Sequence, residues 1–306
     1  MPRFKSIRYQ PAFDKLEKKP DIIFVHNIGS GSSFKIPKNR ARAGAGVILK
    51  ADLGRSTYEH MKRSSVYRKL IMEPFDRVDH FTTFSEVERG YLTDLGIPPE
   101  KISIIPVGIN LENIPDLRLK KGSHRDKLTI GLLARFTEEK GHMSLVEPMT
   151  RLLKEYAGIR FLTAGPKTNV KYADTFIENM SVCKNFRYLG TIEHTSIYSK
   201  FYNKVDIVLV PSIEETGSIT TLEAMACGKA VIASDINPHN VYITSKKNGY
   251  LAGTRDDYYK YCSELLSDPG KMIKLGSEAR KSMTRYDWKM IGVRLEGLYS
   301  NLNIKG

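Results

Sequence analysis

The sequence predicts an α/β protein of two domains, each built on a parallel β-sheet that helices cover. A chain of 306 residues with 41% hydrophobic residues is long enough for two ordinary domains. Short apolar segments alternate with helix-like segments along most of the chain, which is typical of parallel sheets. A charged, glycine-containing stretch at 117–127 interrupts the alternation. We therefore predict a first domain at 1–118 and a second at 119–285, followed by a helix within 286–306.

In the first domain, apolar runs closed by polar residues or glycine predict strands at 21–25, 46–49, 80–84 and 102–107. Residues 27–42 are rich in Gly, Ser, Lys and Arg without an apolar period, which predicts a loop or an irregular helix. Helices are predicted at 57–75 and 85–95. The second of these has Ser85 as its N-cap and Glu88 three positions later, the spacing of a capping box.

In the second domain the alternation is regular. Strands are predicted at 129–134, 159–164, 186–189, 207–210 and 230–233. The intervening helices are predicted at 142–156, 172–180, 195–202 and 218–226, and a further helical stretch begins at Asp256. Ligands of open parallel sheets bind at the carboxyl ends of the strands, so functional side chains are expected in the segments that directly follow these strands.

Composition limits the cellular setting. No run of 18 apolar residues occurs, and the first 20 residues are charged, so neither a membrane span nor a secretory signal is predicted. The cysteines Cys183, Cys227 and Cys262 are odd in number and lack CxxC spacing, which argues against a disulfide framework and a structural zinc site. We expect a cytoplasmic protein with no metal site.

The charge is concentrated near the N-terminus. The formal net charge is +14, and residues 1–70 hold 16 Lys and Arg against 5 Asp and Glu, a net of +11. Such a basic segment suits a polyanion, an acidic substrate or an anionic membrane surface, on which the protein would lie peripherally. A solvated face that only aids solubility explains the charge equally well.

Two glutamates flank the start of a predicted helix in the segment 211–228. Glu215 lies in the loop after the strand 207–210, and Glu223 lies inside the helix. A ligand across the helix start could touch both carboxylates. Between them, phosphate oxygens would meet the positive end of the helix dipole and the free backbone amides of Ser218, Ile219 and Thr220.

Two cations follow the strand 129–134. The planar guanidinium of Arg135 can hold phosphate oxygens, and Lys140 can add a point charge. Together they could compensate a leaving diphosphate without a metal ion. The plain alternative is a solvated mixed-charge face, since Glu138 and Glu139 are neighbours in the sequence.

Five segments occur in a characteristic order: GLLARFTEEKG, FLTAGP, FRYLGTI, VDIVLVPSIEETGSITTLEAMACGKAVIASDI and NGYLAG. Over roughly residues 129–253 they resemble the donor-binding half of the family 4 retaining glycosyltransferases, glycosyl transferases group 1. VDHFTTFSEVERGYLTDLGIPPEKISIIPVGIN resembles the end of that family's first domain. The resemblance implies the GT-B fold, in which two Rossmann-like domains face each other across a cleft and the last helix crosses back to the first domain.

The resemblance also implies an activity and a site. The activity is transfer of a sugar, with retention, from a nucleoside diphosphate to a hydroxyl acceptor on a glycan, a lipid-linked molecule or a small molecule. No metal ion or cofactor is implied. By position the site residues are Arg135 and Lys140 at the diphosphate, Glu223 at the ribose, Glu215 at the transferred sugar, and the backbone of Thr191 and Ile192 at the base.

Three features depart from the family pattern. Thr216-Gly217-Ser218 stands where the family usually has Gly-Phe-Gly, so the contact of Gly217 with the sugar can differ. The family's histidine after the strand 46–49 corresponds to Ala51, and the neighbouring Asp52 either substitutes for it in part or the role is absent. The family's opening strand, glycine-rich turn and helix are not found, which predicts a shortened first domain.

Two other functions fit some of these features. A non-catalytic sugar-nucleotide-binding protein, or a subunit that a partner completes, fits a shortened first domain. Nucleic-acid binding fits the basic segment and its aromatic residues, but no recognisable binding module accompanies them, so a nucleic-acid partner is not expected. The glycine fingerprints of nicotinamide-dependent oxidoreductases and of P-loop kinases do not occur.

Overall fold

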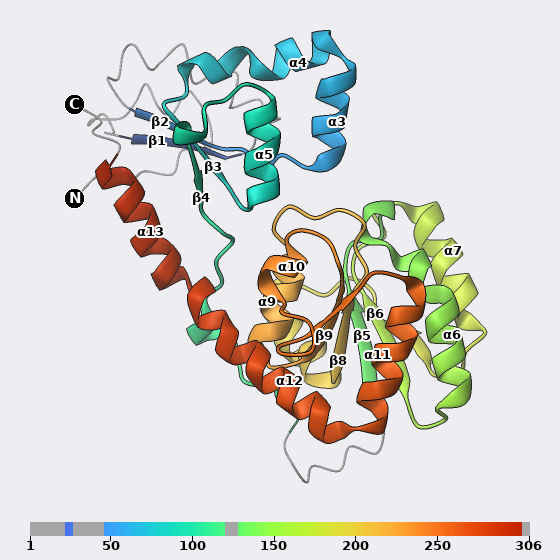
Figure 1. The fold of residues 1–306 in the computed structure, drawn as a ribbon. Helices are drawn as coiled ribbons and strands as arrows, with labels where there is room; N and C mark the ends of the chain where they lie inside the picture. The colour runs from blue at the N-terminus through green and yellow to red at the C-terminus, as the bar shows by residue number, and fades with distance from the viewer. Residues whose placement is uncertain (1–21, 27–45, 120–127, 302–306) are drawn as a thin grey trace. The chain divides into compact units, whose positions relative to one another are not determined.

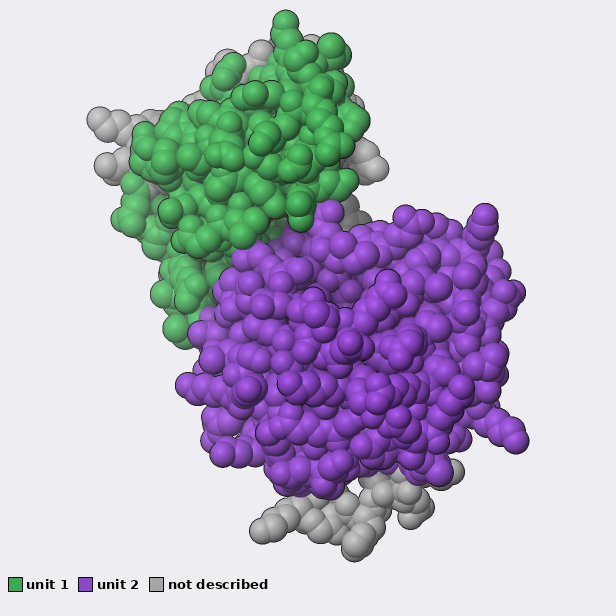
Figure 2. Space-filling model, turned by 45° about the vertical axis from the view of Figure 1, so that its right-hand side comes forward, with its two compact units in different colours: residues 1–107, 289–306 green, residues 108–288 purple. Residues whose placement is uncertain are grey.

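The computed structural model describes residues 22–26, 46–119 and 128–301, coloured along the chain in Figure 1. The predicted loop at 27–42 and most of the charged stretch at 117–127 lie outside the described residues. By compactness the chain divides into two units, coloured separately in Figure 2. Unit 1 comprises Met1–Val107 with Lys289–Gly306, and unit 2 comprises Gly108–Trp288.

Unit 1 is built on a four-stranded parallel sheet in the order β1-β2-β3-β4. Its strands are β1 (Ile22–His26), β2 (Gly46–Lys50), β3 (His80–Thr83) and β4 (Ile102–Ile104). Its α-helices are α3 (Arg55–Arg63), α4 (Ser65–Met72), α5 (Glu86–Asp94) and α13 (Trp288–Asn301), of which α13 begins in unit 2 at Trp288. The ring of Tyr299 on α13 meets Phe24 on β1 edge-on at 6.4 Å, so the last helix packs beside the first described strand.

The region predicted as one helix at 57–75 forms two α-helices and a 3-10 turn. The break lies at Ser64, whose backbone is extended and whose side chain accepts a hydrogen bond from the N–H of Tyr67. A serine in this position ends one helix and caps the next. The apolar period continues through the break because Tyr58 and Met61 on α3 and Ile71 on α4 are all buried. Periodicity alone therefore joined the two helices.

Unit 2 contains a six-stranded parallel sheet in the order β10-β9-β8-β5-β6-β7. Its strands are β5 (Thr129–Leu133), β6 (Arg160–Ala164), β7 (Phe186–Tyr188), β8 (Ile207–Val210), β9 (Ala230–Ser234) and β10 (Tyr250–Ala252). The chain winds outward from β5 to β7 and then returns to β8 on the other side of β5. In such sheets the crevice between the two reversing strands is where ligands bind.

Two groups of helices cover this sheet (Figure 1). α6 packs against α7 and α11, and α9 packs against α12. The bounds are α6 (Val146–Glu155), α7 (Val170–Ser181), α8 (Ile197–Lys200), α9 (Ile219–Ala226), α10 (His239–Tyr242), α11 (Arg255–Ser267) and α12 (Pro269–Ser282). The predicted strands and longer helices are present. Strand β10 and helix α10 were not predicted, because three or four residues carry no periodic signal.

The core of unit 2 consists of fully buried apolar side chains on both sheet and helices, including Leu132, Phe136, Phe161, Phe176 and Ile232. All three cysteines are buried free thiols. No helix in the described part of the chain is both long and apolar enough to cross a bilayer.

Candidate functional site

The loops that follow β5 and β8 touch at the point where the strand order reverses. Gly141, in the loop after β5, has a positive φ of 69°, and a Cβ on it would lie 1.9 Å from the carbonyl oxygen of Pro211. Only glycine therefore allows this approach. The N–H of Ile213 donates to the carbonyl of Glu139 at 2.8 Å and joins the same loops. This contact brings Lys140 beside the segment that contains Glu215.

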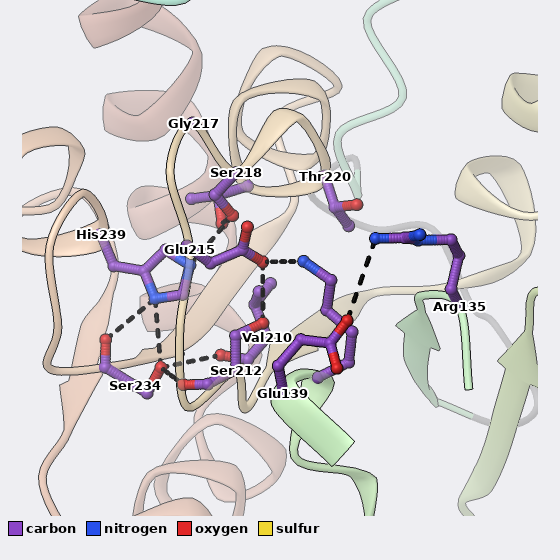
Figure 3. A network of polar contacts seen from close by, with 12 residues as sticks. Arg135, Glu139, Val210, Ser212, Glu215, Gly217, Ser218, Thr220, Ser234 and His239 are labelled. Atoms are coloured by element: carbon purple, nitrogen blue, oxygen red, sulfur yellow. Dashed lines mark hydrogen bonds and ion pairs between the residues drawn. The ribbon is translucent and has the colours of Figure 1, made fainter. Parts of the chain in front are cut away.

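Lys140 and Glu215 form an ion pair with 2.7 Å between Nζ and Oε1, and the side chains are 18% and 10% exposed (Figure 3). The hydroxyl of Ser212 donates to the same Oε1 at 2.8 Å. A lysine has three donors, so Nζ can hold Glu215 and still bind an anion. The two residues that the sequence assigned to one site are thus in direct contact.

Arg135 lies at the same edge of the sheet. Its side chain is 59% exposed and its guanidinium is 4.0 Å from the carboxylate of Glu139. Figure 3 shows the guanidinium reaching toward Thr220, near the start of α9. The hydroxyl of Thr220 donates to the carbonyl of Leu133, the last residue of β5, at 3.4 Å. The start of α9 therefore lies close to both cations, Arg135 and Lys140, at the carboxyl edge of the sheet.

The turn before α9 has a strained backbone. Ser218 is in the left-handed region, with φ 34° and ψ 64°, and Thr221 and Leu222 donate their N–H groups to its carbonyl. The N–H groups of Ser218, Ile219 and Thr220 have no partner within the helix, by helix geometry. With the helix dipole they form a site that favours an anion.

His239, at the start of α10, holds this turn, and the sequence did not predict it. Its Nδ1 lies 3.0 Å from the carbonyl oxygen of Ser234, and its Nε2 lies 2.9 Å from the hydroxyl of Ser218 (Figure 3). Burial lowers the pKa of His239, although the charge of Glu215 opposes the shift. The ring is therefore neutral, with Nδ1 donating and Nε2 accepting from Ser218. Tyr242 also holds the turn, because its hydroxyl donates to the carbonyl of Gly217 at 3.0 Å. The sequence signal that could have identified His239 is its position shortly after the strand β9, where ligands of open parallel sheets bind.

Glu223 lies in a second group of polar side chains, separate from the hydrogen bonds of Glu215. Its carboxylate is 6% exposed and lies 2.9 Å from Nε2 of His194. The hydroxyl of Tyr198 is 3.4 Å from Oε1, and that of Tyr202 is 3.2 Å from Oε2. Burial, assisted by the charge of Glu223, raises the pKa of both tyrosines, so both stay protonated donors. Sequence reasoning found Glu223 but none of these three partners.

Thr191 and Ile192 follow β7 and lead into the 3-10 turn His194–Ser196. Thr191 is exposed and Ile192 is half-buried. The preceding Gly190 accepts a hydrogen bond from the N–H of Gly165, which joins the loops after β6 and β7. This segment is thus next to His194 and its contact with Glu223.

Asp52 belongs to unit 1. It follows β2 with a positive φ of 48°, and its Oδ1 lies 3.4 Å from Nζ of Lys50. Glu88 on α5 accepts hydrogen bonds from the next N–H in the chain, that of Leu53, and from that of Phe84. Two loops at the carboxyl end of this sheet are therefore tied to one carboxylate. Among the described residues of either unit, no group of three or more His, Cys, Asp or Glu side chains could hold a metal ion.

The sequence profile described as "Glycosyl transferases group 1" matches residues 113–282, more than half of the chain. The chain belongs to this family. A second profile, "Glycosyl transferase 4-like domain", matches residues 2–108 of this group 1 chain. The predicted family is thereby confirmed, and retention of configuration stays a prediction.

Two curated relatives of this glycosyl transferase group 1 chain have names that contain a lipid. The first is the alpha-monoglucosyldiacylglycerol synthase of Acholeplasma laidlawii, 26% identical over 212 residues, which are 66% of this chain and 53% of that protein. The second is the N,N'-diacetylbacillosaminyl-diphospho-undecaprenol alpha-1,3-N-acetylgalactosaminyltransferase of Campylobacter jejuni, 28% identical over 249 residues, 78% of this chain and 64% of that protein. The chain thus spans about half the length of the first relative.

Solved structures show the same fold. HepE of Anabaena, in complex with UDP and glucose, superposes with a TM-score of 0.76 at 13% identity, over 92% of this chain and 78% of that one. The sucrose-phosphate synthase of Thermosynechococcus elongatus superposes with a TM-score of 0.78 at 19% identity, over 92% of this chain and 74% of that one. The predicted GT-B fold of this glycosyl transferase group 1 chain, with two parallel-sheet α/β domains, is confirmed.

Proposed function

We propose that this chain transfers a sugar from a nucleoside diphosphate to a hydroxyl acceptor, with retention of anomeric configuration and without a metal ion or other cofactor. The observation that carries the proposal is the pair Lys140 and Glu215 beside the start of α9, at the reversal point of the sheet in a glycosyl transferase group 1 chain. A cation, an acid and free backbone amides at one place suit a sugar bound through a diphosphate.

The diphosphate binds, in this proposal, between Arg135, Lys140 and the backbone N–H groups of Ser218, Ile219 and Thr220. Negative charge develops on the leaving diphosphate as the bond to the sugar breaks. Preorganised cations and amides stabilise such charge in the transition state more than in the ground state. Lys140 is suited to this task because its ion pair with Glu215 already fixes its position.

The remaining donor contacts follow from the neighbouring groups. Glu223 accepts hydrogen bonds from the ribose hydroxyls, and the backbone of Thr191 and Ile192 meets the base. Glu215 and the carbonyl or N–H of Gly217 contact the transferred sugar. Asp52, on unit 1, is assigned to the acceptor side.

The acceptor hydroxyl is proposed to belong to a lipid-linked molecule. Two relatives carry diacylglycerol and undecaprenol in their names. In unit 1, α3 and α4 carry the exposed cations Lys62, Arg63, Arg68 and Lys69 together with the exposed apolar residues Val66 and Leu70. We call these six residues the α3–α4 surface. Its composition suits a peripheral contact with an anionic membrane.

A thermal-shift screen of uridine, guanosine, adenosine and thymidine diphosphate sugars identifies the donor, since a ligand that binds only the folded state raises the melting temperature. Lys140→Ala and Glu223→Ala should each lower donor affinity or kcat/KM at least about tenfold, because a hydrogen bond to a charged group contributes roughly 1.5 to 3 kcal/mol. Lys154→Ala on the exposed face of α6 is the matched control and should change neither quantity. Unaltered kinetics in both site variants would remove the proposed site.

Turnover itself tests the finer parts of the proposal. Activity should survive EDTA, and complete loss that manganese restores would contradict metal independence. The anomeric proton coupling of the product, measured by NMR, should match that of the donor sugar. An inverted coupling would contradict retention.

A further inference from the structure

His194 is an exposed side chain that contacts a buried carboxylate, that of Glu223. Its ring is 74% exposed, yet its Nε2 lies 2.9 Å from Oε1 of Glu223, whose side chain is only 6% exposed. Tyr198 donates to the same oxygen and Tyr202 to the other. A carboxylate offers about four lone-pair positions, and three of them are occupied here.

A ribose on Glu223 needs two of these positions, so one of the three partners has to leave. Tyr202 is fully buried, and Tyr198 is half-buried and stacked on it with ring centroids 5.9 Å apart. His194 meets Tyr198 only edge-on, at 6.4 Å. The imidazole is therefore the partner that can move into solvent with the least loss of packing.

We infer that His194 is a gate of the nucleoside subsite: its ring occupies Glu223 in the free protein and leaves it when the donor binds. The inference rests on the proposed function, because it takes Glu223 as the acceptor of the ribose hydroxyls. A hydrogen bond to a carboxylate is charge-assisted and about twice as strong as one between neutral groups. Donor binding has to break this bond, so the ring of His194 lowers donor affinity.

The other groups around Glu223 are held in place, whereas the ring of His194 is not. Glu223 faces His194 from α9 and Tyr198 from α8, with Tyr202 behind them and Glu193 adjacent in the chain. Burial raises the pKa of both tyrosines, so both remain hydrogen-bond donors to Glu223 after the imidazole has left.

The experiment is calorimetric titration of the full chain with the nucleotide sugar that gives the largest thermal shift. We expect His194→Ala to bind this donor about threefold to tenfold more tightly than the wild type, because no hydrogen bond to Glu223 has to be broken first. His194→Gln keeps a donor for Glu223 and should have a Kd between those of the wild type and His194→Ala.

His60→Ala is the matched control, because His60 is an exposed histidine on α3 of unit 1 and its removal should leave the Kd of the wild type unchanged. An unchanged Kd in His194→Ala overturns the gate. So does weaker binding by His194→Ala, which would mean that the ring contacts the nucleotide. Absence of binding by the wild type for every sugar nucleotide overturns the proposed function as well, so the two failures are distinguishable.

Discussion

Glu88 ties two loops of unit 1 together from inside the protein. Its side chain is 3% exposed and accepts the N–H groups of Leu53 at 2.5 Å and Phe84 at 2.6 Å. Burial raises the pKa of Glu88 to about 7, although both hydrogen bonds act to lower it. The residue next to Leu53 is Asp52, so the ionisation of Glu88 bears on the backbone that carries a proposed acceptor-side group.

The stability of unit 1 should therefore depend on pH through Glu88. The folded pKa lies above the ordinary value of 4.5, so the contribution is fully present below about pH 4.5 and is lost as the pH rises through about 7. The loss is on the order of 3 kcal/mol at most. Glu88→Gln removes this titration but leaves one amide without an acceptor, at a cost of about 1 to 3 kcal/mol.

Thermal melts at pH 5 and pH 8 measure the effect. The Glu88→Gln variant should melt below the wild type at pH 5, and the gap should close or reverse at pH 8. Glu86→Gln, on the exposed side of α5, should follow the wild type at both pH values. A constant gap between Glu88→Gln and the wild type would show that the ionisation of Glu88 does not contribute.

At the scale of single residues, the sequence predicted Lys140, Glu215 and Glu223 as candidate site residues but not the partners to which they bond. Ser85 does cap α5, accepting the N–H of Glu88 at 3.3 Å, as its spacing predicts. The carboxylate of Glu88, however, turns to Leu53, 35 positions earlier in the chain. In the same way His239 reaches Ser218 across 21 positions. Such partners depend on how the strands are ordered, which local spacing does not contain.

At the scale of elements, the site depends on two loops that only glycine can bring together. Gly141 combines a φ of 69° with a Cβ position 1.9 Å from the carbonyl of Pro211. A left-handed backbone costs a residue with a Cβ about 1 to 2 kcal/mol, and here the loops would also have to separate. Gly141 directly follows Lys140, so the separation would move Nζ away from Glu215.

Gly141→Ala should therefore lower donor affinity at least about tenfold and lower the melting temperature by a few degrees. Gly158→Ala is the matched control, because Gly158 is exposed in the same unit and nothing lies within 4 Å of a Cβ built there. Calorimetry and thermal melts report the two quantities separately. Wild-type affinity in Gly141→Ala would show that the loop contact does not position Lys140.

Element boundaries divide into those that sequence could and could not predict. β8 was predicted with its observed bounds because four apolar residues are closed on both sides by polar residues or proline. β4 ends at Ile104 although the predicted strand continues to Val107, because the paired register with β3 ends at Thr83 and Ile104. A strand ends where its neighbour ends, and the neighbour is unknown until the sheet is known.

At the scale of the whole molecule, the order of the motifs in the sequence was sufficient to predict the fold. Five segments in sequence predicted a donor-binding sheet, and the observed strand order reverses between β5 and β8, where Lys140 and Glu215 meet. Composition predicted a basic N-terminal quarter without saying which of its cations share a surface. In the structure α3 and α4 expose Lys62, Arg63, Arg68 and Lys69, and α4 also exposes the apolar residues Val66 and Leu70.

The α3–α4 surface combines cations with exposed apolar side chains, and both contribute to the free energy of binding to an anionic membrane. Val66 is 78% exposed and Leu70 is 56% exposed, and their spacing of four places them on one face of α4. Each lysine or arginine near an anionic membrane contributes about 1 kcal/mol, and apolar side chains add to this when they enter the interface. The exposed cations outnumber the exposed acids on these two helices, because Glu59 is half-buried.

We predict that the protein sediments with vesicles of phosphatidylcholine and phosphatidylglycerol but not with phosphatidylcholine alone, and that added salt weakens the binding. Arg63→Glu with Lys69→Glu should reduce the affinity about tenfold or more, and Val66→Ser with Leu70→Ser should reduce it without changing the salt dependence. Val170→Ser with Val182→Ser, two exposed valines of unit 2, is the matched control and should bind like the wild type. Folding should be unaffected, since exposed substitutions change stability by about 0.5 kcal/mol or less. Equal sedimentation of all variants would place the membrane contact on other residues, and no sedimentation of the wild type would leave the basic charge as a means of solubility alone.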